Sequence, residues 1–153
     1  MLADQYELVR DARKQVFAFF GTIKPADLQK PVTFDGKSIV RLYVHIANTY
    51  QGWLVKFARQ EEPVEFNYEE YDTVEQLEEL FKHIDHLVAR FLQAPATLAG
   101  QPYQNPAVSN QLVLTPLQLF THVVTHEFHH KGQVLMLARQ LGYVPPDTDV
   151  IRF

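Results

Sequence analysis

The chain has 153 residues, of which 46% are hydrophobic, enough to bury about two-thirds of the unfolded surface around one core. We therefore expect a single domain over residues 1–153. The formal net charge of -4, with lysines and arginines scattered along the sequence, argues against nucleic acid as a partner. Cysteine is absent, which excludes disulfides and a protein thiol nucleophile.

The charge pattern of the first twenty residues predicts no membrane partner. Charged side chains interrupt each apolar run, which leaves neither a signal-peptide core nor a membrane-spanning segment. The charged residues in this stretch are Asp4, Glu7, Arg10, Asp11, Arg13 and Lys14. We expect a cytoplasmic protein on this basis.

Two amphipathic helices are predicted in the first part of the chain. The first runs from Leu2 to Phe20 with apolar residues at helical spacing, and Gly21 followed by Pro25 marks its end. The second runs from Ser38 to Arg59, and Ser38 is a good N-cap. Its apolar face consists of Ile39, Leu42, Tyr43, Ile46, Tyr50, Trp53, Leu54 and Phe57.

Two further helices follow. The third begins at Thr73, with Gln76 placed to complete a capping box, and stops before Pro95. The fourth runs from Thr115 to Leu141 and is closed by Gly142. At the rise of an α-helix the fourth is roughly 40 Å long.

The segments between these helices are rich in proline, glycine, asparagine and aspartate, which is typical of loops. They cover Lys24 to Lys37, Glu61 to Asp72 and Ala94 to Leu114. Within the last of them, Gln111 to Leu114 is a candidate for brief pairing with an earlier extended segment. The pattern predicts an all-α fold, but loops of this length permit crossovers, so the spatial order of the helices is not readable from it.

The fourth helix carries two histidines one turn apart. Residues four apart share a helix face, with Cβ atoms about 5–6 Å from each other, so His126 and His130 can bind one metal ion. Even an open catalytic site requires a third ligand. The best candidate is His45 in the second helix, which lies at the margin of the apolar face beside small and polar residues: Arg41, Asn48, Thr49 and Gly52.

Other polar residues surround these three. We interpret His122 as a residue that supports the ligands from behind or lines a pocket. His129 is interpreted as a structural or hydrogen-bonding residue beside the site and not as a fourth ligand. The amide of Gln133 could orient a ligand or a bound water, with a packed polar side chain as the alternative. Arg41 is a candidate to neutralise an anionic part of a thiol or substrate, with a solvated arginine near a helix start as the alternative. A solvated helix face explains the two histidines of the third helix, His83 and His86.

The chain resembles the DinB/YfiT-like metalloenzymes over essentially its whole length. The motifs are a lone histidine in the second helix, a late His-x-x-x-His followed by Lys-Gly-Gln, and a Leu-Gly helix end before a Pro-Pro-x-Thr-Asp tail. They correspond to His45, His126 to Gln133, Leu141-Gly142 and Pro145 to Asp149. The resemblance implies a four-helix bundle that commonly dimerises, in which His45, His126 and His130 bind one divalent metal ion, usually zinc or nickel.

The resemblance also implies a chemistry, because some relatives transfer low-molecular-weight thiols such as bacillithiol or mycothiol. We therefore expect a metal-dependent enzyme that transfers such a thiol to an electrophilic small molecule. A metal held by three neutral histidines keeps its positive charge and an open position, where the pKa of a bound thiol or water falls. Since the chain has no cysteine, the thiol is an exogenous partner. The family name refers to induction by DNA damage, which describes a stress response and not a chemistry.

Two other functions remain open. The spelling His-Glu-x-x-His would make Glu127 the general base of a metal-dependent hydrolase. A metzincin protease, however, needs glycine and histidine where this chain has Gln133 and Met136, and no upstream sheet is predicted. The second alternative is non-catalytic binding of a metal or small ligand, because relatives with intact ligands often lack a known activity.

The fourth helix is also apolar on the side opposite the histidines, through Leu117, Val124, Phe128 and Leu135. A helix that is apolar on two faces is buried on both. We therefore predict a homodimer, with coverage by the loop from Ala94 to Leu114 as the alternative.

Overall fold

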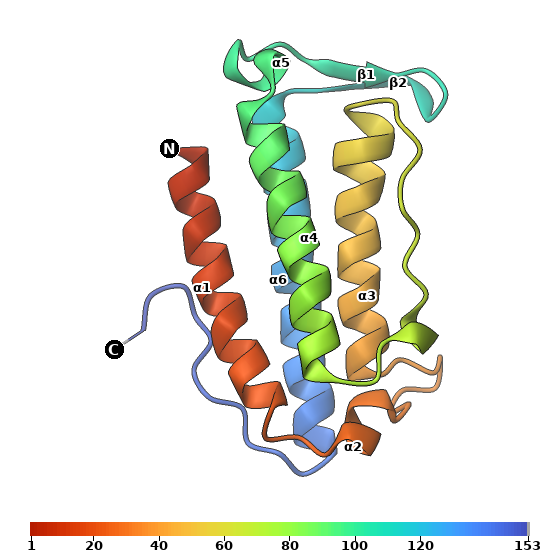
Figure 1. Ribbon diagram of the computed structural model, residues 1–153, viewed down its shortest axis with the longest axis vertical. Helices are drawn as coiled ribbons and strands as arrows, with labels where there is room; N and C mark the ends of the chain where they lie inside the picture. The colour runs from red at the N-terminus through yellow and green to blue at the C-terminus, as the bar shows by residue number, and fades with distance from the viewer. Residues whose placement is uncertain (153) are drawn as a thin grey trace.

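The computed structural model describes residues 1–152, which form a mostly helical protein with one small hairpin. Four long helical segments run side by side along the longest axis (Figure 1). No helix among the described residues has both the length and the apolar character needed to cross a membrane. In chain order the elements are α1 (Leu2–Phe20), α2 (Pro25–Gln29), α3 (Ile39–Tyr50), η1 (Gln51–Phe57), η2 (Tyr68–Glu70), α4 (Val74–Gln93), α5 (Pro95–Leu98), β1 (Tyr103–Asn105), β2 (Ser109–Leu114) and α6 (Pro116–Gln140).

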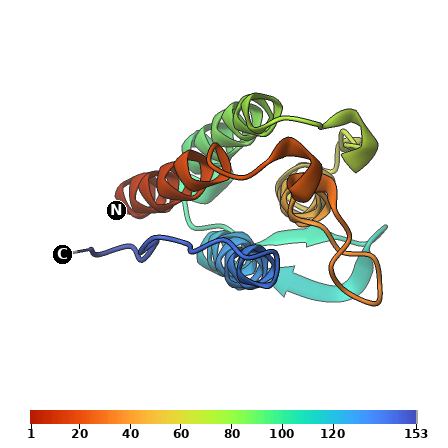
Figure 2. The ribbon, with the colours of Figure 1, turned by 90° about the horizontal axis from the view of Figure 1, so that it is seen from below.

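The long helices enclose one apolar core. α3 packs against α4 and α6, and α1 packs against the same two helices, so the four surround a common centre when viewed along their axes (Figure 2). Aromatic rings from three helices meet there, with the Phe17 ring centroid 5.3 Å from that of Tyr43 and 5.6 Å from that of Phe81. The contact between α3 and α6 is the one that brings the predicted histidines together.

The predicted starts of the second, third and fourth helices are confirmed by their caps. Thr73 and Thr115 each form a capping box with the glutamine three residues later. The Ser38 hydroxyl accepts a hydrogen bond from the backbone N–H of Arg41 at 3.1 Å. These side chains satisfy backbone donors that a helix start leaves without partners, which is why short polar residues mark the boundaries so clearly.

The second predicted helix differs from expectation in its last part. We expected one continuous helix from Ser38 to Arg59, whereas residues Gln51–Phe57 form a π-helix. The side chain of Gln51 is buried and forms hydrogen bonds to residues outside its own helix. Its amide nitrogen donates to His83 Nε2 at 3.0 Å, and its oxygen accepts from the backbone N–H of Val64 at 3.2 Å. A π-turn takes in one more residue than an α-turn and redirects the side chains that it carries. Apolar spacing alone gave no sign of this insertion.

The predicted pairing near Gln111 to Leu114 is confirmed as an antiparallel hairpin, so the protein is not wholly α-helical. Tyr103 lies opposite Leu114, and Gln104 lies opposite Val113. The hairpin sits at the end of the molecule where α6 begins (Figure 1). It is fastened to η1 by Asn105, whose amide nitrogen donates to the carbonyl of Lys56 at 2.6 Å.

The C-terminal segment runs back beside α6 and α1 (Figure 2). Lys131 on α6 is buried and donates from Nζ to the carbonyl of Thr148 at 2.6 Å, and Arg152 pairs with Asp11 on α1. The C-terminal segment is therefore held against α6 at Lys131. On the apolar side of α6, Leu135 is buried, Val124 and Phe128 are partly buried, and Leu117 is 58% exposed.

Candidate metal centre

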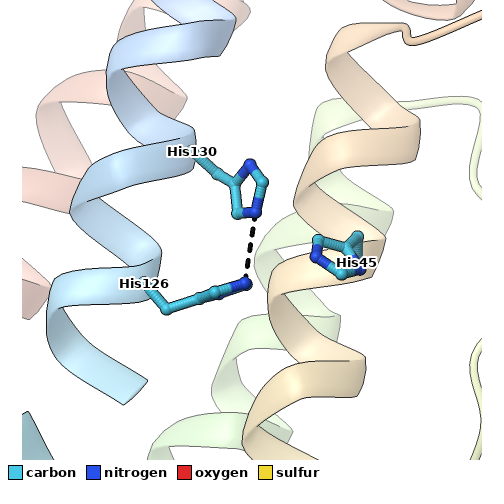
Figure 3. A group of neighbouring side chains, drawn as sticks. All are labelled: His45, His126 and His130. Atoms are coloured by element: carbon cyan, nitrogen blue, oxygen red, sulfur yellow. Dashed lines mark hydrogen bonds between the residues drawn. The ribbon is translucent and has the colours of Figure 1, made fainter. Parts of the chain in front are cut away.

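The three histidines predicted as ligands lie together between α3 and α6 (Figure 3). His45 comes from α3, and His126 and His130 come from successive turns of α6. One ring nitrogen from each histidine lies within 4.8 Å of the others, an arrangement that could hold a metal ion. The Nε2 atoms of His126 and His130 are 3.2 Å apart.

The distance between these two nitrogens fits a shared cation. Two nitrogens bound to one tetrahedral zinc at about 2.0–2.1 Å lie about 3.3 Å apart, close to the observed separation of 3.2 Å. His126 Nδ1 is buried and has no hydrogen-bond partner among the described residues. Its Nε2, which faces His130, is thus the one nitrogen of His126 with a polar neighbour.

Gln133 fixes the orientation of the His130 ring. Nδ1 of His130 donates to the Gln133 side-chain oxygen at 2.7 Å, which leaves Nε2 of His130 without a proton and facing the cluster. The Gln133 amide nitrogen donates in turn to His129 Nε2 at 3.1 Å. Of the two interpretations of Gln133, the structure therefore supports the orienting one, and His129 is a hydrogen-bonding neighbour as expected.

Burial keeps the three imidazoles in the neutral form that binds metals. It lowers the pKa of His126 to about 4, with the neighbouring His130 and His45 acting in the same direction. Burial also lowers the pKa of His45 and of His130, although the bond to Gln133 opposes the shift in His130. Since the charged form is disfavoured by lost hydration and by the other rings, the cluster stays neutral near pH 7.

Glu127 does not belong to this cluster. It is 3% exposed, and both of its oxygens are bonded on the core side of α6. Arg13 on α1 donates to them from Nε at 2.7 Å and from Nη2 at 2.9 Å, and the Tyr50 hydroxyl donates to Oε2 at 2.7 Å. With its acceptors engaged by a buried guanidinium and a phenol, Glu127 is not placed as a base for the metal site.

Sequence reasoning missed the buried ionic network around Glu127. Arg13 also donates from Nη1 to Asp85 on α4 at 2.7 Å, and the Tyr6 hydroxyl donates to the same carboxylate oxygen at 2.8 Å. A signal was present: Arg13 lies one helical turn from both Val9 and Phe17 on the buried stripe of α1. A charged residue on an apolar stripe calls for a buried partner.

The remaining predicted site residues divide into two groups. His122 is exposed, and its ring lies 4.7 Å from that of Trp53 and 6.1 Å from that of His126, so its role as pocket lining stays a prediction. Arg41 instead donates to the carbonyl of Gly36 and stacks over the ring of Tyr68. Neither contact supports the predicted role of Arg41 in the site. His83 and His86 are exposed, as expected, although His83 also bonds to Gln51.

Comparisons with known proteins find one family over the whole length of the chain. The model of the DinB family matches residues 1–153. The protein named Protein DinB from Bacillus subtilis (strain 168) is 35% identical to this chain over 78 residues. The aligned part is 50% of this chain and 44% of that relative, so the match spans less than half of the relative's length.

Proposed function

The chain belongs to the DinB family, and from this membership and the histidine cluster we propose a metal-dependent enzyme. His45, His126 and His130 would bind one divalent ion, zinc or nickel, within the four-helix bundle of this family. The enzyme would transfer a low-molecular-weight thiol to an electrophilic small molecule. The observation that carries this proposal is the convergence of three neutral imidazole nitrogens within 4.8 Å of one another.

The donor set suits activation of a thiol. When bound by three neutral ligands, a divalent metal lowers the pKa of a thiol that occupies its open position. The chain supplies no thiol of its own, because it contains no cysteine. His45 is the most exposed of the three ligands, so the cluster is accessible from solvent on the side of α3.

In the proposed reaction, the thiol and the electrophile supply all of the atoms that change their bonding. The sulfur of the incoming thiol forms a bond to an electrophilic carbon, a leaving group such as a halide departs with its electron pair, and the thiol proton passes to solvent. The residues of the chain hold the ion and orient the reactants. The hydrolase alternative receives less support, because Glu127 is bonded to Arg13 and Tyr50.

A paired assay tests this proposal. We would measure conjugation of a halogenated nitroaromatic electrophile with bacillithiol, mycothiol or glutathione, beside ester and peptide hydrolysis without thiol. We expect turnover that requires both metal and thiol and that persists in substantial part in Glu127→Gln, assayed at a temperature where that variant is folded. Thiol-independent hydrolysis that disappears in Glu127→Gln would overturn the transferase. Metal binding without turnover in any assay would favour the non-catalytic alternative.

We also propose that the protein forms a homodimer through the apolar side of α6 that includes Leu117. Sedimentation at tens of micromolar should give about twice the monomer mass of 17.7 kDa. Leu117→Glu should shift the protein to monomer, whereas Leu98→Glu, at an exposed leucine on α5, should not. A wild-type monomer at this concentration would show that Leu117 is simply an exposed apolar residue.

A further inference from the structure

A cavity of about 450 Å³ lies between the α3–η1 segment and the hairpin turn. One of its lining residues, Thr49, is one helical turn, about 6 Å, beyond His45 on the same helix. Ala107 and Val108 of the hairpin turn line it from the other side, and it is open to solvent. The lining residues are Thr49, Gly52, Trp53, Lys56, Phe57, Ala107 and Val108.

An aromatic wall joins this cavity to the metal centre. The Trp53 ring lies edge to face against His122 at 4.7 Å between centroids, and His122 lies 6.1 Å from His126. Thr49, four residues before Trp53 on the same helical segment, donates from its hydroxyl to the carbonyl of His45 at 3.0 Å. Two residues that line the cavity, Trp53 and Thr49, are therefore in direct contact with histidines of this region.

The cavity is preformed, because its outer wall is fastened to η1. The Asn105 amide donates to the Lys56 carbonyl at 2.6 Å, and its oxygen accepts from the backbone N–H of Ala107 at 3.0 Å. Gln60 adds a second tie by donating to the carbonyl of Gln104 at 2.9 Å. The π-helical turn carries Trp53 and Lys56 in the same wall, and such turns occur frequently at functional sites.

The lining residues define the chemistry of a ligand. Trp53, Phe57 and Val108 offer flat and apolar surface, which suits an aromatic or other planar group. Lys56 supplies the positive charge, and among residues 1–152 it has no carboxylate partner of the kind that Lys37 and Lys82 have. We propose that this cavity binds the electrophilic substrate, a planar apolar small molecule that carries one anionic group for Lys56.

The assignment to the electrophile, and not to the thiol, rests on the proposed function. Low-molecular-weight thiols are strongly hydrophilic, whereas the cavity presents aromatic and aliphatic walls with a single cation. Binding of a planar anion can be measured without any thiol, metal or turnover. A lack of probe binding in the cavity and a lack of transferase activity are therefore distinguishable results.

Trp53 makes the cavity directly observable, because it is the only tryptophan of the chain. Nitroaromatic groups quench tryptophan fluorescence on contact, so we would titrate the full chain with 4-nitrobenzoate and with the neutral 4-nitrobenzamide. We expect saturable quenching by both, with the carboxylate binding about three- to five-fold more tightly, the modest gain expected of an ion pair at an exposed lysine. Equal affinities for the two probes would overturn the assignment of Lys56.

Three variants complete the test. Lys56→Gln should weaken 4-nitrobenzoate to the level of 4-nitrobenzamide and leave the latter unchanged. Gly52→Leu should block both probes, because a Cβ at Gly52 meets no atom within 4 Å and the added side chain would fill the cavity. Lys14→Gln, which removes an exposed charge from α1, should behave as wild type.

The outcomes separate the two proposals. Quenching that is unchanged in both Lys56→Gln and Gly52→Leu, with circular dichroism showing folded variants, would place the probes elsewhere and overturn the cavity assignment. If the probes bind as expected, the halogenated counterpart, 4-chloro-3-nitrobenzoate, should be conjugated several-fold faster by wild type than by Lys56→Gln. Equal conjugation rates in the two proteins would contradict the substrate assignment, whatever the metal content.

Discussion

His126 and Glu127 are neighbours in the sequence but lie in opposite environments on α6. His126 faces two other imidazoles and has a pKa lowered to about 4. Glu127 is buried on the core side, where Arg13 and Tyr50 bond to its oxygens. His-Glu-x-x-His in this chain therefore combines a cluster of histidines on one side of α6 with a buried structural ion pair on the other. The motif is therefore not evidence of a protease.

Removal of Glu127 should produce the largest effect, because it leaves the Arg13 charge buried without its main partner. We expect Glu127→Ala to lower the free energy of unfolding by about 3–5 kcal/mol in urea denaturation. The exposed pair of Glu79 and Lys82 is the matched control, and Glu79→Ala should cost at most about 1 kcal/mol.

A double variant sharpens this test. Arg13→Met combined with Glu127→Leu removes both charges, so its cost should be well below the sum of the two single substitutions. If Glu127→Ala were as mild as Glu79→Ala, Glu127 would not be structural and a role near the metal would have to be reconsidered.

Substitutions beside the histidine cluster should change the affinity for metal and not the free energy of unfolding. Gln133→Leu removes the acceptor of His130 Nδ1, and loss of such an orienting contact weakens a metal site about 10–100-fold. Competition titration against a chromophoric chelator would measure it. Gln140→Leu at the exposed end of α6 should leave the affinity unchanged. Wild-type affinity in Gln133→Leu would mean that the Gln133 amide is merely packed beside the site.

A smaller effect is expected in the pH dependence of the metal-free protein. The pKa of His126 is about 4 when folded and about 6.5 when unfolded, so the unfolded chain binds the extra proton between these values. Stability is thus intact above about pH 6.5 and declines as the pH falls toward 4. We expect a loss of about 1 kcal/mol from this residue, reduced by the partial exposure of its ring.

Urea denaturation near neutral pH and near pH 4.5 would measure this loss. His126→Asn should show a pH dependence about 1 kcal/mol smaller than that of wild type. The same dependence in both proteins would show that the ring is not desolvated enough to resist protonation.

The helix boundaries and the histidine trio were predictable because they depend on local rules. Caps at Ser38, Thr73 and Thr115 satisfy donors within their own turn, and His126 and His130 share a face by helical spacing alone. The place of His45 beside the other two histidines depends on how α3 packs against α6, which helical periodicity does not predict. Periodicity made His45 a candidate, and the family resemblance assigned it as the third ligand.

The features that were missed depend on contacts distant in sequence. The π-helix accompanies bonds from Gln51 to His83 and Val64, and the Arg13–Glu127 pair joins residues 114 positions apart. The apolar stripe around Arg13 marks it as a buried charge, but nothing in its sequence neighbourhood points to Glu127. A charge on an apolar stripe is a sign that a partner exists, but it does not say which residue it is.

Metal content tests the central claim most directly. Protein purified without a metal-affinity column, which could load nickel artificially, would be supplied with zinc or nickel, dialysed and analysed by plasma mass spectrometry. Wild type and His86→Ala, an exposed histidine on α4, should hold about one ion per chain. His45→Ala and His130→Ala should each lose most of it. Stoichiometric metal in both of these variants would contradict the assignment of the three histidines as the metal site.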